Sequence, residues 1–156
     1  MALQQGQTTS FKVELLQGVH NFTASTGDTF KIALYEASAS LGPTTTAYTT
    51  TGEITGTGNA AGGITLTNVT PTSSGTTAYT TFANASWPNA TFTARGALIY
   101  NATDGNKSVC VLDFGSDKTA TAQTFLVQFP AAGATTALVR IEWRGTRFTP
   151  FRRTFS

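Results

Sequence analysis

Hydrophobic and polar residues alternate along much of the chain, as they do in β-strands that bury one face. Phe30, Ile32 and Leu34, for example, share one face of a strand predicted over residues 29–35. No window of about a dozen residues keeps the apolar i, i+3, i+4, i+7 spacing of an amphipathic helix. The pattern predicts strands over residues 11–15, 29–35, 64–69, 78–82, 91–100, 109–112, 124–129 and 137–143.

Turn-forming and small residues separate these segments. Residues 37–63 are rich in Ser, Thr, Gly and Ala, which predicts a long loop or a pair of short edge strands. Residues 87–89 predict a corner, and Gly96 predicts a bulge inside a strand. Residues 113–118 and 130–136 predict turns.

The strongest local signal is a hairpin. Two apolar runs, residues 97–100 and 109–112, flank a segment with Asp104-Gly105 at its tip. Both arms are apolar on both faces, so we expect the hairpin at the centre of the sheets, covered on each side.

Together these elements predict an all-β protein. The expected architecture is an antiparallel β-sandwich or jelly-roll-like barrel of about eight or nine short strands. At 156 residues the chain has the length of one domain. We place a single β domain over residues 1–143 and an extended C-terminal arm over residues 144–156.

Charge is scarce in this chain. Only 12% of the residues are Asp, Glu, Lys or Arg, about half of the usual quarter, and Thr supplies roughly one residue in five. An isolated soluble protein normally relies on charge for solubility. A neutral, threonine-rich surface therefore favours a chain that covers much of its exterior with partners.

The few charges are unevenly distributed. Residues 1–139 carry five basic and seven acidic side chains, which gives this body a net charge of −2. Residues 140–156 carry five arginines and one acid, Glu142, which gives +4.

Arginines and aromatic residues alternate in the arm. This composition suits nucleic acid or an acidic groove on a protein. Pro150 excludes a continuous helix and the segment is too short for a binding module, which disfavours specific nucleic-acid recognition. We expect an arm that docks onto a partner chain, the alternative being an artificial or disordered tail. The predicted partner-binding residues are Arg144, Arg147, Phe148, Phe151, Arg152, Arg153 and Phe155.

The chain offers little for catalysis. His20 is the only histidine, and Cys110 is the only cysteine and lies between valines, as a buried small hydrophobe does. Asp104, Asp113 and Asp117 lack the spacing of a calcium-binding loop. We therefore expect no enzymatic activity, cofactor or metal.

A phosphate-binding loop and a pair of catalytic carboxylates are two further kinds of site to consider. The pair Gly62-Gly63 lacks the Lys-Ser/Thr of a phosphate loop and is interpreted as flexible loop glycines. Paired carboxylates for glycoside hydrolysis remain open, because such residues need not be close in sequence.

The N-terminal sequence lacks the basic and long apolar regions of a signal peptide, and no stretch approaches the roughly 20 apolar residues of a membrane span. We expect no membrane partner and a cytoplasmic site of synthesis.

Several sequence segments resemble those of small structural proteins of tailed-bacteriophage virions. They are residues 11–22 with residues 29–35, and residues 94–101 continuing to residues 111–115. This resemblance implies a component of the capsid or tail that assembles in the cytoplasm of a bacterial host, binds other virion proteins and forms homo-oligomers.

Three functions follow as expectations. The first is a head decoration or cement protein that bridges neighbouring shell subunits. The second is a tail, collar or fibre component, which differs in copy number. The third is a carbohydrate-binding β-sandwich with Trp87 or Tyr48 as a sugar platform.

Overall fold

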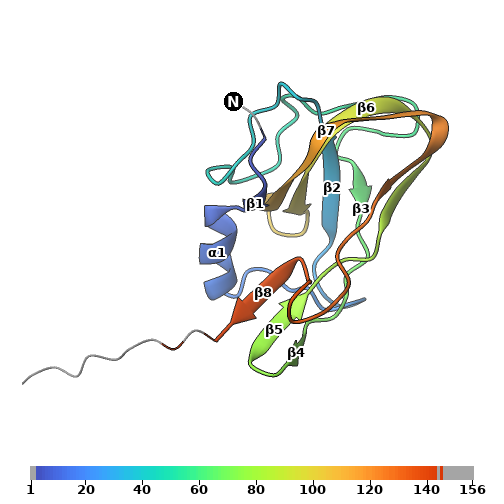
Figure 1. Cartoon of the computed structure of the whole chain (residues 1–156). Helices are drawn as coiled ribbons and strands as arrows, with labels where there is room; N and C mark the ends of the chain where they lie inside the picture. The colour runs from blue at the N-terminus through green and yellow to red at the C-terminus, as the bar shows by residue number, and fades with distance from the viewer. Residues whose placement is uncertain (1–2, 144, 146–156) are drawn as a thin grey trace, which may run out of the picture.

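The computed structural model describes residues 3–143 and 145, and these residues form two antiparallel sheets (Figure 1). The larger sheet has the strand order β1-β7-β6-β2-β3 and the smaller one has the order β4-β5-β8. The elements are β1 (Gly6–Gln7), α1 (Thr9–Leu16), β2 (Phe30–Tyr35), β3 (Ile64–Thr65), β4 (Thr72–Ser74), β5 (Thr77–Thr80), β6 (Ala85–Asn101), β7 (Lys107–Val127) and β8 (Val139–Glu142). The all-β, antiparallel prediction is confirmed.

The predicted hairpin is present and central. β6 and β7 pair from Asn101↔Lys107 outward, and the turn uses left-handed backbone at Gly105 and Asn106. Both faces of the arms are covered, since Leu98, Ile99, Val109 and Val111 are fully buried.

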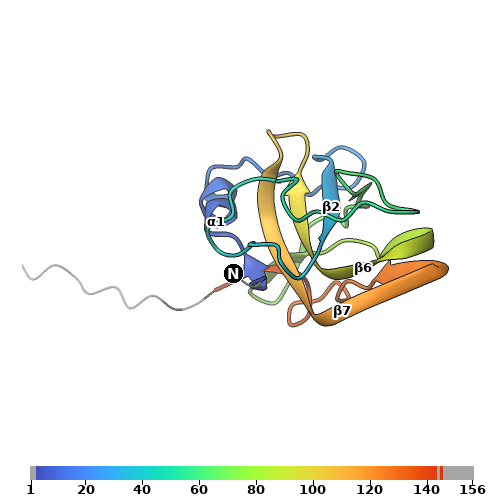
Figure 2. The same cartoon turned by 90° about the horizontal axis from the view of Figure 1, so that it is seen from above.

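The hairpin is much longer than the sequence predicts. β6 has 17 residues and β7 has 21, and they run side by side in a curved ribbon (Figure 2). The predicted corner at residues 87–89 and the predicted turn at residues 113–118 are wrong. Both segments are irregularities inside the ribbon, because bulges and turns use the same Gly, Asn and Asp residues.

The bulges can be located from the pairing. From Asp113 to Lys118 β7 advances five positions while β6 advances two, from Gly96 to Ala94. The extra residues of β7 bulge out, with Gly115 at φ +76°. The irregularity predicted at Gly96 is therefore present as a register shift, but the extra residues lie on the partner strand β7. Three further register shifts lie between Trp87 and Ala90, between Ala90 and Phe92, and between Ile99 and Tyr100.

The strand predicted over residues 11–15 is wrong, because α1 occupies this segment. Thr8 caps the helix by accepting a hydrogen bond from the Phe11 N–H at 3.3 Å. Phe11 is buried and Leu15 packs against the same core. Their i, i+4 spacing fits a helix as well as the five-residue alternation fits a strand.

Residues 37–63 form the predicted long loop, with isolated bridges such as Tyr35↔Glu53 and no named strand. Ala39 and Leu41 from this loop pack with Leu3 over the outer face of the large sheet. The strand predicted over residues 64–69 is shorter, since β3 ends at Thr65 and Asn68 makes only a bridge to Phe82.

The main core is aromatic and lies between the two sheets. Phe22 and Phe30 stack at 4.4 Å between ring centroids, and Phe82 tilts against both. Val139 of the small sheet belongs to the same cluster. The two sheets therefore share one core, as the layers of a sandwich do.

Gly63 and Gly75 separate the effect of a left-handed backbone from the effect of close packing. Both have positive φ, +64° and +57°, but a Cβ on Gly63 would overlap the Ile32 carbonyl while a Cβ on Gly75 meets nothing within 4 Å. Gly63 is thus tightly packed and not the flexible loop glycine that the sequence predicts.

We expect Gly63→Ala to lower the free energy of unfolding by more than about 3 kcal/mol and Gly75→Ala by only about 1 kcal/mol. Urea denaturation of the two variants measures this, and equal losses would contradict the packing at Gly63.

Candidate assembly surface

An apolar stripe on β8 begins in the core and continues past it. Residues two apart on a strand share a face, which places Val139, Ile141 and Trp143 in one row. Val139 is 5% exposed, Ile141 57% and Trp143 76%. The Trp143 N–H still donates to the Thr76 carbonyl at 3.3 Å, so the pairing with the β4–β5 side of the sheet extends this far.

The neighbouring strands add no charge to this face. Ala78 lies opposite Ile141, and Ser73 lies opposite Ala78. All three are exposed. Ala78, Ile141 and Trp143 are called the β8 stripe below.

The other face of β8 is polar. Arg140 Nη1 lies 3.4 Å from Glu142 Oε1, a distance at which an exposed ion pair contributes little to stability. The two faces of β8 therefore differ, and its apolar face is the β8 stripe.

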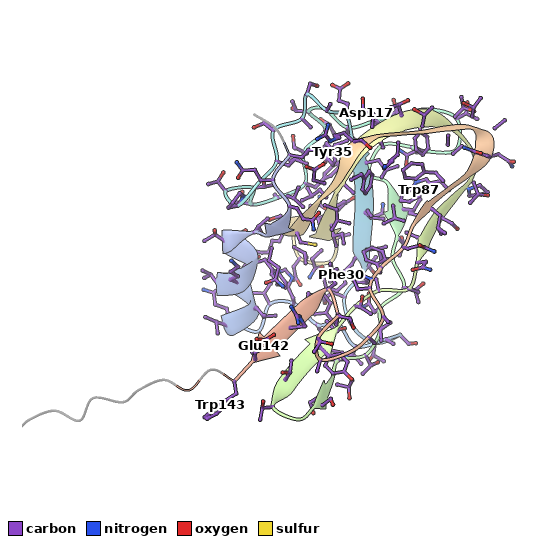
Figure 3. All side chains as sticks on the ribbon, viewed as in Figure 1. Phe30, Tyr35, Trp87, Asp117, Glu142 and Trp143 are labelled. Atoms are coloured by element: carbon purple, nitrogen blue, oxygen red, sulfur yellow. The ribbon has the colours of Figure 1, made fainter. Side chains whose placement is uncertain are left out.

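β8 is also an edge strand, since the small sheet has the order β4-β5-β8. Trp143 projects away from the body at the end of β8 (Figure 3). The sequence continues from here into the predicted arm. Its predicted partner-binding residues, Arg144, Arg147, Phe148, Phe151, Arg152, Arg153 and Phe155, lie outside the described residues.

A second apolar feature runs along β7. It is a hollow of about 580 Å³, here called the β7 groove. Its apolar lining includes Leu112, Phe114, Phe125, Leu126, Phe129 and Leu138.

Aromatic packing makes the floor of the β7 groove rigid. Phe125 lies edge-on to Trp87 with ring centroids 5.8 Å apart, and Phe92 tilts against it at 5.1 Å. Phe114 closes one side at 6.1 Å from Phe125. Leu126 is 49% exposed at the wall, so the groove presents apolar surface to solvent without being an enclosed cavity.

One acid and one base line the β7 groove. Asp113 Oδ1 accepts hydrogen bonds from Arg95 Nε at 3.0 Å and from the Gly115 N–H at 2.9 Å. The Gly115 N–H and the Arg95 side chain lower the pKa of Asp113, which keeps the carboxylate charged. Lys118 Nζ bonds to Ser116 Oγ at 3.0 Å.

His20 serves the fold. Asn101 Oδ1 accepts from the N–H groups of Thr103 and Asp104, which turns Asn101 Nδ2 toward His20 Nδ1 at 3.0 Å. Nδ1 is therefore the acceptor, and Nε2 donates to Glu14 Oε2 at 3.0 Å. The ring is surrounded by Phe11, Phe22 and Phe30, so no substrate reaches it.

The tryptophan proposed as a sugar platform is inaccessible. Trp87 is fully buried, and its Nε1 donates to Asn59 Oδ1 at 2.9 Å. Tyr48 stacks on Tyr100 at 4.8 Å and donates its hydroxyl to Glu53. Burial and the hydrogen bond to Glu53 raise the pKa of Tyr48 to about 12. Trp87 is thus closed to a ligand, while Tyr48 is half-buried with one face of its ring on Tyr100.

The three aspartates examined for calcium do not converge. Asp104 bonds to Asn101 in the hairpin turn, and Asp113 bonds to Arg95 on β6. Over the described part of the chain, no three His, Cys, Asp or Glu residues gather as metal ligands. Within the same residues, no helix has the length and apolarity to cross a bilayer.

Comparisons with protein-family models, curated proteins and solved structures found no match for this chain.

Sequence reasoning missed both the β8 stripe and the β7 groove. The alternation of Val139, Ile141 and Trp143 is visible in the sequence. It does not show that the last two side chains lie beyond the buried core. The groove combines residues 112–114 with residues 125–138, which only long-range packing brings together.

Cys110 gives a direct test of the core around the hairpin. It is 2% exposed, and burial raises the pKa of its thiol to about 12. At pH 8 the buried thiol is therefore almost entirely protonated, whereas about a quarter of a free cysteine is ionised. We expect alkylation at least about 100-fold slower in the native protein than in denaturant. A Ser74→Cys variant, exposed on β4, should add one fast-reacting equivalent. Rapid native labelling of Cys110 would contradict its burial.

Proposed function

We propose that this chain is a structural protein of a tailed-bacteriophage virion, most specifically a head decoration or cement protein. The observation that carries the proposal is the β8 stripe, an extension of the core face into solvent at the root of the arm. The resemblance of residues 11–22, 29–35, 94–101 and 111–115 to phage virion proteins supports the choice of assembly.

The β8 stripe is suited to a protein partner. Exposed Trp and Ile side chains on a strand edge are sites where another chain adds or packs, and isolated proteins usually protect such edges with charge. Only Arg140 and Glu142 carry charge on β8, and they lie on the opposite face. A partner that covers the stripe removes this exposure.

Low charge supports the same role. A decoration protein acts by adhesion, bridging shell subunits so that expansion of the shell must break many contacts. Stable interfaces bury about 1,600 Å² in total, more than two side chains supply. The arm follows the β8 stripe in sequence and carries further apolar and cationic side chains.

A mass-spectrometric count of this chain in purified particles of the encoding phage tests the assignment. Hundreds of copies per particle are expected for a decoration protein, whereas a handful indicates the tail. Absence of the chain from purified particles would refute a virion role.

The contribution of the stripe is tested by the double variant Ile141→Ser/Trp143→Ser. Loss of two buried apolar side chains at an interface should weaken binding to undecorated particles by at least about tenfold. Because both side chains are more than half exposed in the free chain, the domain should stay folded. Leu16→Ser is the matched control, since Leu16 is 91% exposed on α1. Equal binding of the double variant and the control in a co-sedimentation assay would exclude the stripe.

A further inference from the structure

The β7 groove is an apolar site that the described fold leaves open. Phe114, Leu126 and Phe129 contribute to its wall, and none of the three is fully buried. A hollow of about 580 Å³ lies within the range of sites that take small ligands or several side chains. Its aromatic floor favours ring-to-ring contacts.

The arm carries a matching set of side chains. Phe148, Phe151 and Phe155 are spaced along 13 residues that follow β8. Phenylalanine and leucine side chains line the groove. Burial of the phenylalanine rings of the arm against them would favour binding. Each fully buried phenylalanine contributes about 1.5–3 kcal/mol.

Charge favours the same pairing at longer range. The body over residues 1–139 has a net charge of −2 and residues 140–156 have +4. The arm of one copy is therefore attracted to the body of another over roughly one Debye length, about 10 Å at 0.1 M salt. Asp113, whose two bonds both end on Oδ1, offers its second oxygen to an arginine at the wall of the β7 groove.

The direction of β8 favours a groove on a neighbouring copy. Leu138 lines the groove and directly precedes β8, so the chain leaves its own groove along this strand. Five residues later, after roughly 16 Å of extended chain, Trp143 projects away from the body (Figure 3). To fill its own groove, an arm would have to fold back along the length of β8.

We propose that the arm, residues 144–156, docks through Phe148 and Phe151 into the β7 groove of a second copy of this chain. The contact is heterologous, because arm and groove are different surfaces, and it links copies head to tail. The inference rests on the assembly role proposed above and deepens it by naming the partner of the arm.

Sedimentation velocity of the full chain, in a series reaching roughly 1 mM, tests the contact. The groove variant is Leu126→Asp, and the arm variant is Phe148→Ser/Phe151→Ser. Val13→Asp is the matched control, since Val13 on α1 is 51% exposed and Leu126 is 49% exposed. We expect the unmodified chain and the control to associate, more strongly at low salt. Each of the other two variants should have a dissociation constant at least tenfold higher.

Mixing supplies the decisive outcome. The groove variant keeps its arm and the arm variant keeps its groove, so an equimolar mixture should form a dimer that grows no further. A mixture that stays monomeric, or an arm variant that associates like the unmodified chain, overturns the proposal. A full chain that is monomeric throughout the series overturns it as well, since its groove is then filled in cis or empty.

Two further controls keep the result interpretable. Thr124→Arg adds a cation at an exposed position of the same groove and should repel the arm even if Leu126→Asp fails to fold. Particle binding is scored separately. If the full chain binds particles but does not self-associate, or self-associates equally well in all variants, this inference fails and the decoration role stands. Self-association that the variants weaken, without particle binding, refutes the role and retains the contact.

Discussion

Burial of the β6–β7 hairpin on both faces is the constraint on which the other elements depend. Ile99 and Val109 face the aromatic core between the sheets, while Leu98 and Val111 face the opposite side. That second side must be covered, and the long loop after β2 and the segment around Leu3 cover it. A loop that would otherwise be free is thereby fixed as part of the core, because exposed apolar strands of this length would aggregate.

Neutral hydrogen bonds do the work that ion pairs do in many proteins. Trp87 donates to Asn59, Tyr100 to the Gly62 carbonyl, and Ser108 to the Thr45 carbonyl, each joining the central hairpin to the loop. Each satisfies a buried polar group whose loss would cost about 1–3 kcal/mol. These three contacts fix the loop on the hairpin without charge, while the carboxylate of Glu14 accepts from His20 on the other side of the core.

The sequence predicts the fold class, the hairpin and its central place because these depend on residue type and local alternation. It does not predict α1, since Phe11 and Leu15 satisfy a helix and a strand over so short a span. It also breaks the ribbon at residues 113–118, where the same residues form a turn or a bulge and only pairing with β6 decides. The sequence does not predict the β8 stripe for a similar reason. Whether Ile141 is exposed depends on how far the core beneath β5 and β8 extends.

Energetics indicate how the two surfaces would act together. Association costs about 4–15 kcal/mol in lost translational and rotational freedom, while one buried phenylalanine returns about 1.5–3 kcal/mol. A single arm in a single groove therefore gives a weak complex. On a lattice that already holds neighbouring copies, the effective concentration of each arm rises to the millimolar range, and the β8 stripe of Ala78, Ile141 and Trp143 adds a second contact. Under the proposed role, such a chain would be largely monomeric in dilute solution and would bind cooperatively where a shell arranges its partners.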